Sequence, residues 1–513
     1  MKNLPIGVQS FEKLIQGQYL YIDKTKHIYN LLATSGGIYF LSRPRRFGKS
    51  LLISTLEAIF AGKKDLFKDL WIYDQDYDWQ EHPVIRISFG GVLYDNKQTL
   101  IDYLSKELSD IANKYNVKLS EPRFDFRFKE LIQKLSQINK VAILIDEYDK
   151  AMLDVIDNIE LSKANRETLR GFYSVIKETD QHLKFVFLTG VSKFSKVSVF
   201  SGLNNLNDLT MDTRYAELLG YTQQELERYF VDRINILAEH EQLNINELLD
   251  KIKHWYNGYR FSKENTSVYN PFSTLLLFDK NDFANHWFTT GTPTFLLNII
   301  KKNKYTALDI DSIESSTEVF DSYDIDNLNV EPLLYQTGYL TICDYNKERD
   351  TYKLGYPNYE VKNSFLKRLV NLFSAVSTPL ISSHLYKLID SLTVNDLDNF
   401  FETLEVFFAN IPYDIQISTE KYYQSVFYLV FTLIGLIIEA EVKTNKGRID
   451  AVIVLEDSIY IFEFKLEGSK EEALNQIKER EYYQKYQNSN KKIVLVGVEF
   501  DSEKRNIGEW LVG

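Results

Sequence analysis

The chain has 513 residues, 44% of them hydrophobic, and a net charge of −12. It is too long for a single hydrophobic core, so two to four domains are expected, and with only 10 prolines and 22 glycines it is not a largely disordered protein. The acidic balance argues against a protein that coats nucleic acid, although a local basic groove remains compatible with it.

Cellular location follows from the cysteine count and from the apolar runs. The one cysteine, Cys343, excludes an intramolecular disulfide and a cysteine-based zinc site, and it is typical of a reducing compartment. The first residues lack the apolar core of a signal peptide. The longest apolar run, residues 426–438, is shorter than the ~20 residues that cross a bilayer. We therefore expect a cytoplasmic protein with no membrane partner.

A loop rich in arginine, residues 41–50, lies between an apolar run and a helical pattern that starts at Leu51. Its end, Gly48-Lys49-Ser50, is the closing half of a phosphate-binding loop, in which backbone N–H groups face an anion, the lysine binds the terminal phosphates and the serine ligates Mg²⁺. The opening glycine is replaced by Arg43, so the arginines are expected either to add charge at the phosphates or to form ion pairs elsewhere. The predicted phosphate contacts are Arg45, Arg46, Phe47, Gly48, Lys49, Ser50 and Leu51.

Further strands and helices alternate along the first part of the chain. Strands are predicted at residues 84–89, 141–147 and 183–190, and helices at residues 51–60, 100–115 and 128–135. This alternation is typical of an α/β domain with a largely parallel sheet, which we assign to residues 1–215.

The strand at 141–147 is continuously apolar until it ends in Asp146 and Glu147, at the end of the sheet where α/β proteins place ligands. Asp146 is predicted to reach Mg²⁺, and Glu147 to orient or deprotonate the attacking water. Thr189 ends the next strand and could sense the γ-phosphate or that water. The alternatives are an acid pair that stabilises a helix N-terminus and a threonine that only caps its strand.

Residues 216–380 are predicted to form a helical lid and a mostly helical middle region. A capping box at Thr222 to Glu225 opens the lid, and the segment 333–342 is one of the expected helices. The third domain, residues 381–513, has strands predicted at 447–455, 458–465 and 492–498 and a helix at 474–486.

Asp450, Glu463 and Lys465 form the pattern D…E-x-K on two paired strands. Two carboxylates at one end of a hairpin can hold Mg²⁺, and a lysine beside them can position the water that attacks a phosphodiester. Glu441 could be an additional ligand, and Gln476 and Tyr482 could face substrate. The alternative is a solvated hairpin face that carries an ion pair.

Together these motifs resemble a bacterial family with an AAA-ATPase-like N-terminal domain and a PD-(D/E)xK nuclease-like C-terminal domain. The resemblance covers nearly the whole chain and rests on segments 21–25, 43–50, 144–149, 188–193, 256–259, 336–339, 447–450 and 463–465. In that family a loop without the opening glycine is normal. The resemblance implies a P-loop NTPase core with a helical lid, ATP binding and hydrolysis, and a restriction-endonuclease-like α/β fold at the C-terminus.

The leading hypothesis is therefore an ATPase whose nucleotide state controls a metal-dependent, nuclease-like domain that acts on DNA. One alternative is a nucleotide-controlled switch whose C-terminal domain only binds nucleic acid or protein, and another is an ATPase that remodels a protein partner. ATPases of this class often act as oligomers with an arginine supplied in trans, so a homo-oligomer is expected, although the sequence singles out no arginine for that role.

Overall fold

The computed structural model describes residues 1–33, 37–193, 199–200, 203, 205–287, 294–303, 305, 307–311, 313–320, 329–409, 419–445, 448–465, 468–481, 483–501, 503–504 and 506–513. Gly447 of the predicted strand and Tyr482 of the predicted helix lie outside these residues. The chain forms two compact units, Met1–Leu296 with Ile313–Val361, and Leu297–Ser312 with Lys362–Gly513. The predicted boundaries at residues 215 and 380 stay predictions.

A five-stranded parallel sheet is the centre of the first unit. Its strand order is β2 (Val84–Ser88), β3 (Val141–Asp146), β4 (Leu183–Gly190), β1 (Ile38–Ser42) and β5 (Leu206–Asp208). All residues of β1 and β3 are buried, as their continuous apolar runs predict. The strand that precedes the arginine-rich loop and the strand that ends in two acids are thus separated by β4 alone.

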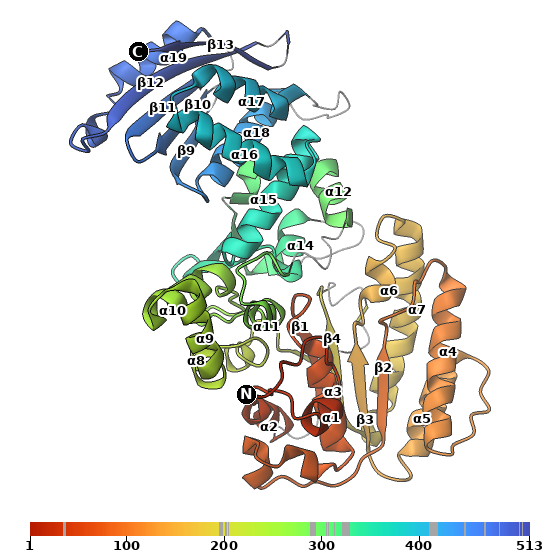
Figure 1. Ribbon diagram of the computed structural model, residues 1–513. Helices are drawn as coiled ribbons and strands as arrows, with labels where there is room; N and C mark the ends of the chain where they lie inside the picture. Colours follow the sequence, from red (N-terminus) through yellow and green to blue (C-terminus); the bar gives the residue numbers. More distant parts are fainter. Residues whose placement is uncertain are drawn as a thin grey trace. The chain divides into compact units, whose positions relative to one another are not determined.

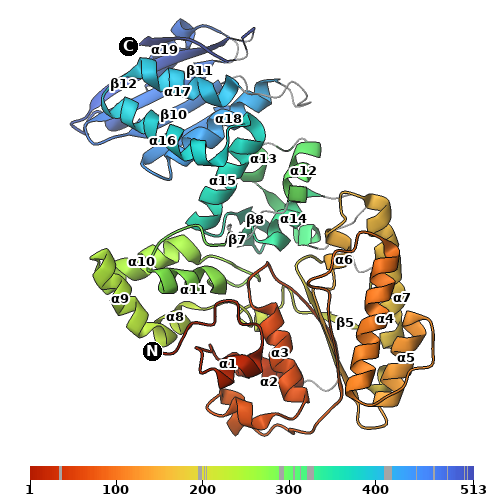
Figure 2. The same ribbon diagram turned by 45° about the vertical axis from the view of Figure 1, so that its right-hand side comes forward.

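Helices cover both faces of this sheet (Figures 1 and 2). On one side lie α1 (Phe11–Gln16), α2 (Thr25–Ala33) and α3 (Lys49–Phe60), of which α3 packs directly on β2, β3 and β4. On the other lie α4 (Lys97–Lys114), α5 (Phe124–Leu135) and α7 (Ile159–Glu178), while the short α6 (Lys150–Leu153) follows the acidic strand end. The predicted parallel α/β domain is confirmed.

Four helices form a second apolar core in the same unit: α8 (Gln223–Tyr229), α9 (Val231–Glu241), α10 (Ile245–Tyr256) and α11 (Pro271–Lys280). The predicted capping box is present, since Thr222 Oγ1 accepts from the N–H of Glu225 and Glu225 accepts from the N–H of Thr222. Glu225 also binds Lys24 Nζ at 2.6 Å, which ties the helices to the N-terminal segment.

The middle region contains several helices, as predicted, together with a small sheet. Besides α12 (Thr294–Lys302), α13 (Ala307–Asp311) and α14 (Val330–Thr337), this region contains a sheet of β6 (Glu314–Ser316), β8 (Thr351–Gly355) and β7 (Thr341–Asn346). The helix predicted at 333–342 ends at Thr337, because Gly338 takes the left-handed conformation with φ of +88° and closes the helix.

The second unit contains a mixed sheet with the order β13 (Asn506–Val512), β12 (Lys492–Asp501), β11 (Ser458–Lys465), β10 (Arg448–Val454) and β9 (Glu439–Asn445). Strands β11 and β12 are parallel and the other pairs are antiparallel. Its helices are α15 (Tyr359–Ser374), which contains the boundary between the units, α16 (Thr378–Thr393), α17 (Leu397–Ala409), α18 (Thr419–Ile434) and α19 (Lys470–Glu479).

Helices pack on both faces of this sheet. Phe462 and Phe464 contact aromatic rings of α17 and α18, whereas Ile459 and Ile461 form a core with Leu474 of α19. The helix predicted at 474–486 begins earlier and ends earlier, because Ser469 and Glu472 make a capping box and Glu481 adopts a φ of +53°. No described helix is long and apolar enough to cross a membrane.

Candidate functional sites

The arginine-rich loop runs from the end of β1 to the start of α3. Gly48 precedes the helix with φ of +90°, a conformation that glycine adopts at little cost, and Arg46 has φ of +69°. The first N–H groups of the twelve-residue helix α3 have no partner within the helix, so they can donate to an anion. The loop therefore has the elements of an anion site without the opening glycine.

Lys49 is folded into this loop. Its side chain is buried, and Nζ donates hydrogen bonds to the carbonyl oxygens of Arg43 at 2.8 Å and Pro44 at 2.9 Å. Burial lowers the pKa of Lys49 to about 8, while the carboxylates of Asp146 and Asp149 act in the opposite direction. The ammonium group is held at the centre of the loop, beside the acidic end of β3.

Asp146 ends β3, and Glu147 follows it directly. Asp146 is 2% exposed, and its Oδ1 atom has no hydrogen-bond partner among the described residues. Burial, reinforced by the neighbouring Asp146, raises the pKa of Glu147, whose backbone φ is +54°. A buried carboxylate oxygen without a donor suits a cation, so the residues present fit Mg²⁺.

Lys49 and Glu147, but not the buried Asp146, line one cleft of about 450 Å³ in the first unit. The loop contributes Arg45, Arg46, Gly48, Lys49, Ser50 and Leu51, and the acidic segment contributes Glu147, Asp149, Lys150 and Asp154. Six of the seven predicted phosphate contacts thus reach the cleft. The seventh, Phe47, is buried behind the loop, where its ring meets Tyr259 at 4.9 Å between ring centroids.

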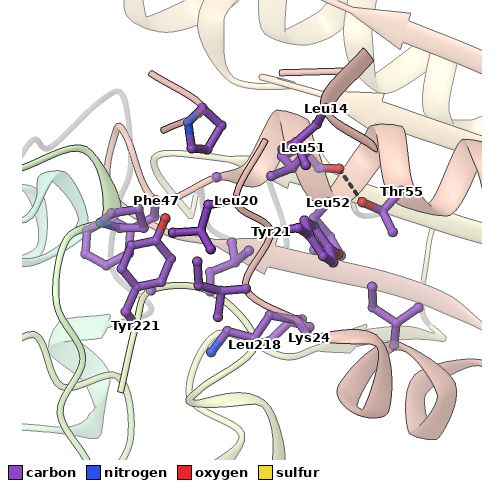
Figure 3. A pocket seen from close by; sticks show the side chains of 17 residues that line it. Leu14, Leu20, Tyr21, Lys24, Phe47, Leu51, Leu52, Thr55, Leu218 and Tyr221 are labelled. Carbon is purple, nitrogen blue, oxygen red and sulfur yellow. Dashed lines mark hydrogen bonds between the residues drawn. The ribbon is translucent and has the colours of Figure 1, made fainter. Parts of the chain in front are cut away.

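A smaller, mostly apolar pocket adjoins the cleft (Figure 3). It shares Pro5, Gly48, Leu51, Tyr221 and Pro271 with the cleft. Its other lining residues come from the N-terminal segment, the arginine-rich loop, α3 and the segment before α8, and include Leu20, Tyr21, Phe47, Leu52, Thr55 and Leu218. The Thr55 hydroxyl donates a hydrogen bond of 2.8 Å to the Leu51 carbonyl oxygen. The pocket and the cleft together can take a flat apolar group joined to an anionic chain.

The second unit brings Asp450 and Glu463 directly opposite each other on β10 and β11. Directly opposed residues of an antiparallel pair share a face, so both carboxyl groups lie on the side of the sheet that α19 covers. Glu463 is fully buried, and Lys465 Nζ lies 3.9 Å from its Oε1 atom. Lys465 also donates a hydrogen bond to Oε1 of Gln476 on α19, so all four predicted side chains are neighbours.

Comparison with known proteins identifies two domains in the chain. A family model described as Predicted AAA-ATPase matches residues 5–200, and a model of the PD-(D/E)XK nuclease superfamily matches residues 418–510. The chain belongs to this AAA-ATPase-like family with a C-terminal nuclease-superfamily domain. A relative named as an uncharacterized protein in the vnfD 5'region of Azotobacter chroococcum mcd 1 is 38% identical over 526 residues, which cover 100% of this chain and 99% of the relative. The family resemblance and the P-loop and nuclease-like fold classes are confirmed.

Besides Phe47 and Asp146, two further residues considered in the sequence analysis do not line the cleft. Thr189 is buried, and its hydroxyl donates to the Leu41 carbonyl at 2.9 Å, which joins β4 to β1. Arg43 is 1% exposed and donates to the carbonyl oxygens of Ser42 and Thr210, both at 2.9 Å. Two roles were open for Arg43, charge at the phosphates or an ion pair, and its guanidinium group is instead turned into the protein, where backbone carbonyl oxygens bind it.

Within the nuclease-superfamily domain, Glu441 lies on β9, a strand that the sequence analysis did not predict, and it contacts two lysines. Lys443 Nζ lies 3.0 Å and Lys485 Nζ 3.2 Å from its carboxylate oxygens, and these hydrogen bonds lower the pKa of Glu441. No cluster of three or more metal-ligating side chains occurs in the described parts of the chain. Asp450 and Glu463 thus form an acid pair, which fits a cation bound by two carboxylates together with water or phosphate oxygens.

Asp149 is a site residue that the sequence analysis did not single out. It is 1% exposed, and its Oδ2 atom accepts from the N–H groups of Val191 at 3.0 Å and Ser192 at 2.6 Å. The carboxylate thereby fixes the loop after β4 beside the acidic end of β3. A third acid three residues after Asp146 was the available signal, but periodicity alone does not separate an anchoring acid from a solvated one.

Proposed function

We propose that this protein binds ATP with Mg²⁺ and hydrolyses it in the AAA-ATPase domain. The observation that carries the proposal is the convergence of Lys49, Ser50 and Glu147 on one cleft, at the N-terminus of α3. The cleft can hold the triphosphate, and the adjoining apolar pocket can hold the base. Magnesium would offset charge on the β- and γ-phosphates, with Ser50 and Asp146 as the residues that hold it.

The chain's own residues then have distinct roles. The Lys49 ammonium exchanges the carbonyl groups of Arg43 and Pro44 for phosphate oxygens, and the first N–H groups of α3 donate to the same anion. Glu147, whose pKa is raised by burial, accepts a proton from the attacking water. Arg45 and Arg46 are exposed on the loop and line the cleft, where they are placed to neutralise charge.

The second part of the proposal is that nucleotide state controls a metal-dependent nuclease in the C-terminal domain. Asp450 and Glu463 would hold the cation, which would supply charge neutralisation at the scissile phosphate of DNA. Lys465 would position the water, and Gln476 would orient Lys465 through the hydrogen bond between them. A homo-oligomer in the cytoplasm is part of the same proposal.

Phosphate release from ATP tests the first part. The wild-type protein should release phosphate only with Mg²⁺, Lys49→Ala should abolish release, and Lys64→Ala, which changes a lysine outside the cleft, should leave it unchanged. Wild-type protein without turnover under Mg²⁺ would overturn the hydrolysis proposal. Binding of labelled ATP, measured separately, distinguishes a site that only binds from one that hydrolyses.

Cleavage of DNA tests the second part. Asp450→Ala and Lys465→Ala should each stop cleavage without changing ATP turnover, and cleavage that persists in both variants would reject the assignment.

A second candidate function is a nucleotide-controlled switch whose C-terminal domain only binds nucleic acid or protein. The observation that favours it is the acid pair at Asp450 and Glu463, which provides fewer ligands than a cluster of three. In that case wild-type protein does not cleave DNA, and Asp450→Ala leaves DNA binding unchanged.

A further inference from the structure

The phosphate loop is held from outside by residues more than 200 positions further along the chain. The Phe47 ring is 1% exposed and meets the Tyr259 and Phe261 rings edge-on, at 4.9 and 5.3 Å between centroids. The Arg43 guanidinium lies 4.1 Å from the centroid of the Phe261 ring. The segment that follows α10 therefore covers the side of the loop that faces away from the cleft.

Gly338 extends this cover to Pro44, the loop residue that follows Arg43. A Cβ atom added to Gly338 would come within 2.7 Å of Cβ and 2.9 Å of Cγ of Pro44, so a side chain at this position would displace the loop. The close approach explains why a glycine stands where α14 ends.

Trp287 adds a polar contact between this cover and the loop. Its indole Nε1–H donates to the carbonyl oxygen of Arg45 at 3.3 Å, and its backbone N–H donates to Oε1 of Glu360 at 2.5 Å. Trp287 is 7% exposed, and Glu360, in the first turn of α15, is fully buried. One residue thus joins the loop to the start of α15.

The contact with Arg45 has a geometric consequence. In a trans peptide the C=O of one residue and the N–H of the next point in opposite directions, so fixing the Arg45 carbonyl also fixes the direction of the Arg46 N–H. Arg46 has φ of +69°, a conformation that a non-glycine residue keeps only when its surroundings hold it. A glycine at position 46 would adopt this backbone without support, whereas arginine there needs contacts that hold it.

We propose that Trp287 is a positioning residue of the nucleotide site, which orients the Arg45–Arg46 peptide so that the Arg46 N–H donates to phosphate. This proposal rests on the proposed nucleotide-binding function. Glu360 supports it by holding the Trp287 backbone. Trp287 is then part of the nucleotide site, where it supports the left-handed backbone of Arg46.

Two measurements test the proposal. The first is amide hydrogen exchange of peptides covering residues 43–50 in nucleotide-free protein, where Trp287→Phe removes the indole donor but keeps an aromatic ring. Exchange in this segment should become faster in Trp287→Phe and in Glu360→Ala, and Glu360→Gln, which keeps an acceptor, should restore protection. Trp79→Phe is the matched control, because Trp79 packs on Phe67 away from the loop.

The second measurement is the affinity for MgATP, followed with a fluorescent ATP analogue. Loss of one hydrogen bond that orients the loop should weaken binding about three- to tenfold in Trp287→Phe and leave Trp79→Phe unchanged. Unchanged exchange at residues 43–50 in Trp287→Phe would overturn the proposal. Faster exchange with unchanged affinity would also overturn it, while the proposed function would stand. Wild-type protein that binds no MgATP would overturn both, and the exchange result would still show whether Trp287 holds the loop.

Discussion

Nζ of Lys49 donates a hydrogen bond of 2.8 Å to the carbonyl oxygen of Arg43, the residue that stands in place of the opening glycine. The lysine therefore stabilises the loop, and under the proposed function it exchanges this contact for phosphate oxygens. The same burial that creates this contact lowers the pKa of Lys49 to about 8. The protonation of Lys49 and the conformation of the loop are therefore linked.

This link predicts proton uptake when ATP binds. Phosphate oxygens favour the charged ammonium and raise the pKa of Lys49, so affinity should fall as pH rises above about 8, and binding at pH 8 should take up about half a proton. Calorimetric titrations in buffers with different ionisation enthalpies measure that number. Lys49→Arg, whose side chain stays charged, should bind without this uptake. Wild-type uptake near zero would contradict the prediction.

Glu360 predicts a pH dependence of stability. Burial raises the pKa of Glu360 from 4.5 to about 7, so the folded state holds this proton more tightly than the unfolded state, and the free energy of unfolding falls as pH rises from 4.5 to 7. Titration of Glu360 lowers the free energy of unfolding by at most on the order of 3 kcal/mol. Glu360→Gln should therefore match the wild type at pH 4.5 and be more stable at pH 7.5, as measured by the unfolding midpoint.

The matched control for Glu360 is Glu264→Gln, which changes an exposed glutamate of the same unit. In Glu264→Gln, the unfolding midpoint should differ between pH 4.5 and pH 7.5 by the same amount as in the wild type. A Glu360→Gln protein whose midpoint follows that of the wild type at both pH values would exclude a raised pKa for Glu360.

Two glycines should respond in opposite directions to alanine. Gly338→Ala combines φ of +88° with a contact 2.7 Å from Pro44, so it should destabilise the first unit by about 1–3 kcal/mol and weaken MgATP binding. Gly171→Ala, inside α7 with nothing within 4 Å of the new Cβ, should stabilise by about 0.5–1 kcal/mol. Thermal unfolding of both variants measures this. A Gly338→Ala protein as stable as wild type would mean that the loop has room to move.

The acid pair of the second unit predicts stabilisation by a divalent cation. At Mn²⁺ concentrations about 100 times the dissociation constant, binding should add about 2.7 kcal/mol and raise the unfolding midpoint by several degrees. Asp450→Asn should abolish the shift. Asp457→Asn, in the turn of the same hairpin, should keep it. A shift that survives in Asp450→Asn would place the cation elsewhere.

Much of the fold could be predicted from local pattern. The buried strands β1, β3 and β4 are uninterrupted apolar runs, and their polar ends mark one end of the sheet. Opposed Asp450 and Glu463 follow from two adjacent strands and a short turn. The edge strands β9 and β13 were missed, because β9 has little apolar content and β13 does not alternate regularly between apolar and polar residues.

The parts of the site that escaped prediction depend on contacts between distant segments. Arg43 was expected near phosphate or in an ion pair because the loop is basic, but the carbonyl of Thr210 and the ring of Phe261 bind it on the other side. Trp287 carries no local signal, since its role comes from meeting Arg45 from 242 positions away. The periodicity of a single sequence does not reveal contacts between residues that lie so far apart in the chain.

The central claim is that ATP turnover in the AAA-ATPase domain controls DNA cleavage in the nuclease-superfamily domain. Its most direct test is cleavage of DNA with Mg²⁺, measured with and without ATP, in wild-type protein, Lys49→Ala and Asp450→Ala. We predict that ATP changes the cleavage rate of the wild type, that Lys49→Ala loses this dependence, and that Asp450→Ala hydrolyses ATP without cleaving DNA. Cleavage by wild-type protein at the same rate with and without ATP would contradict the account.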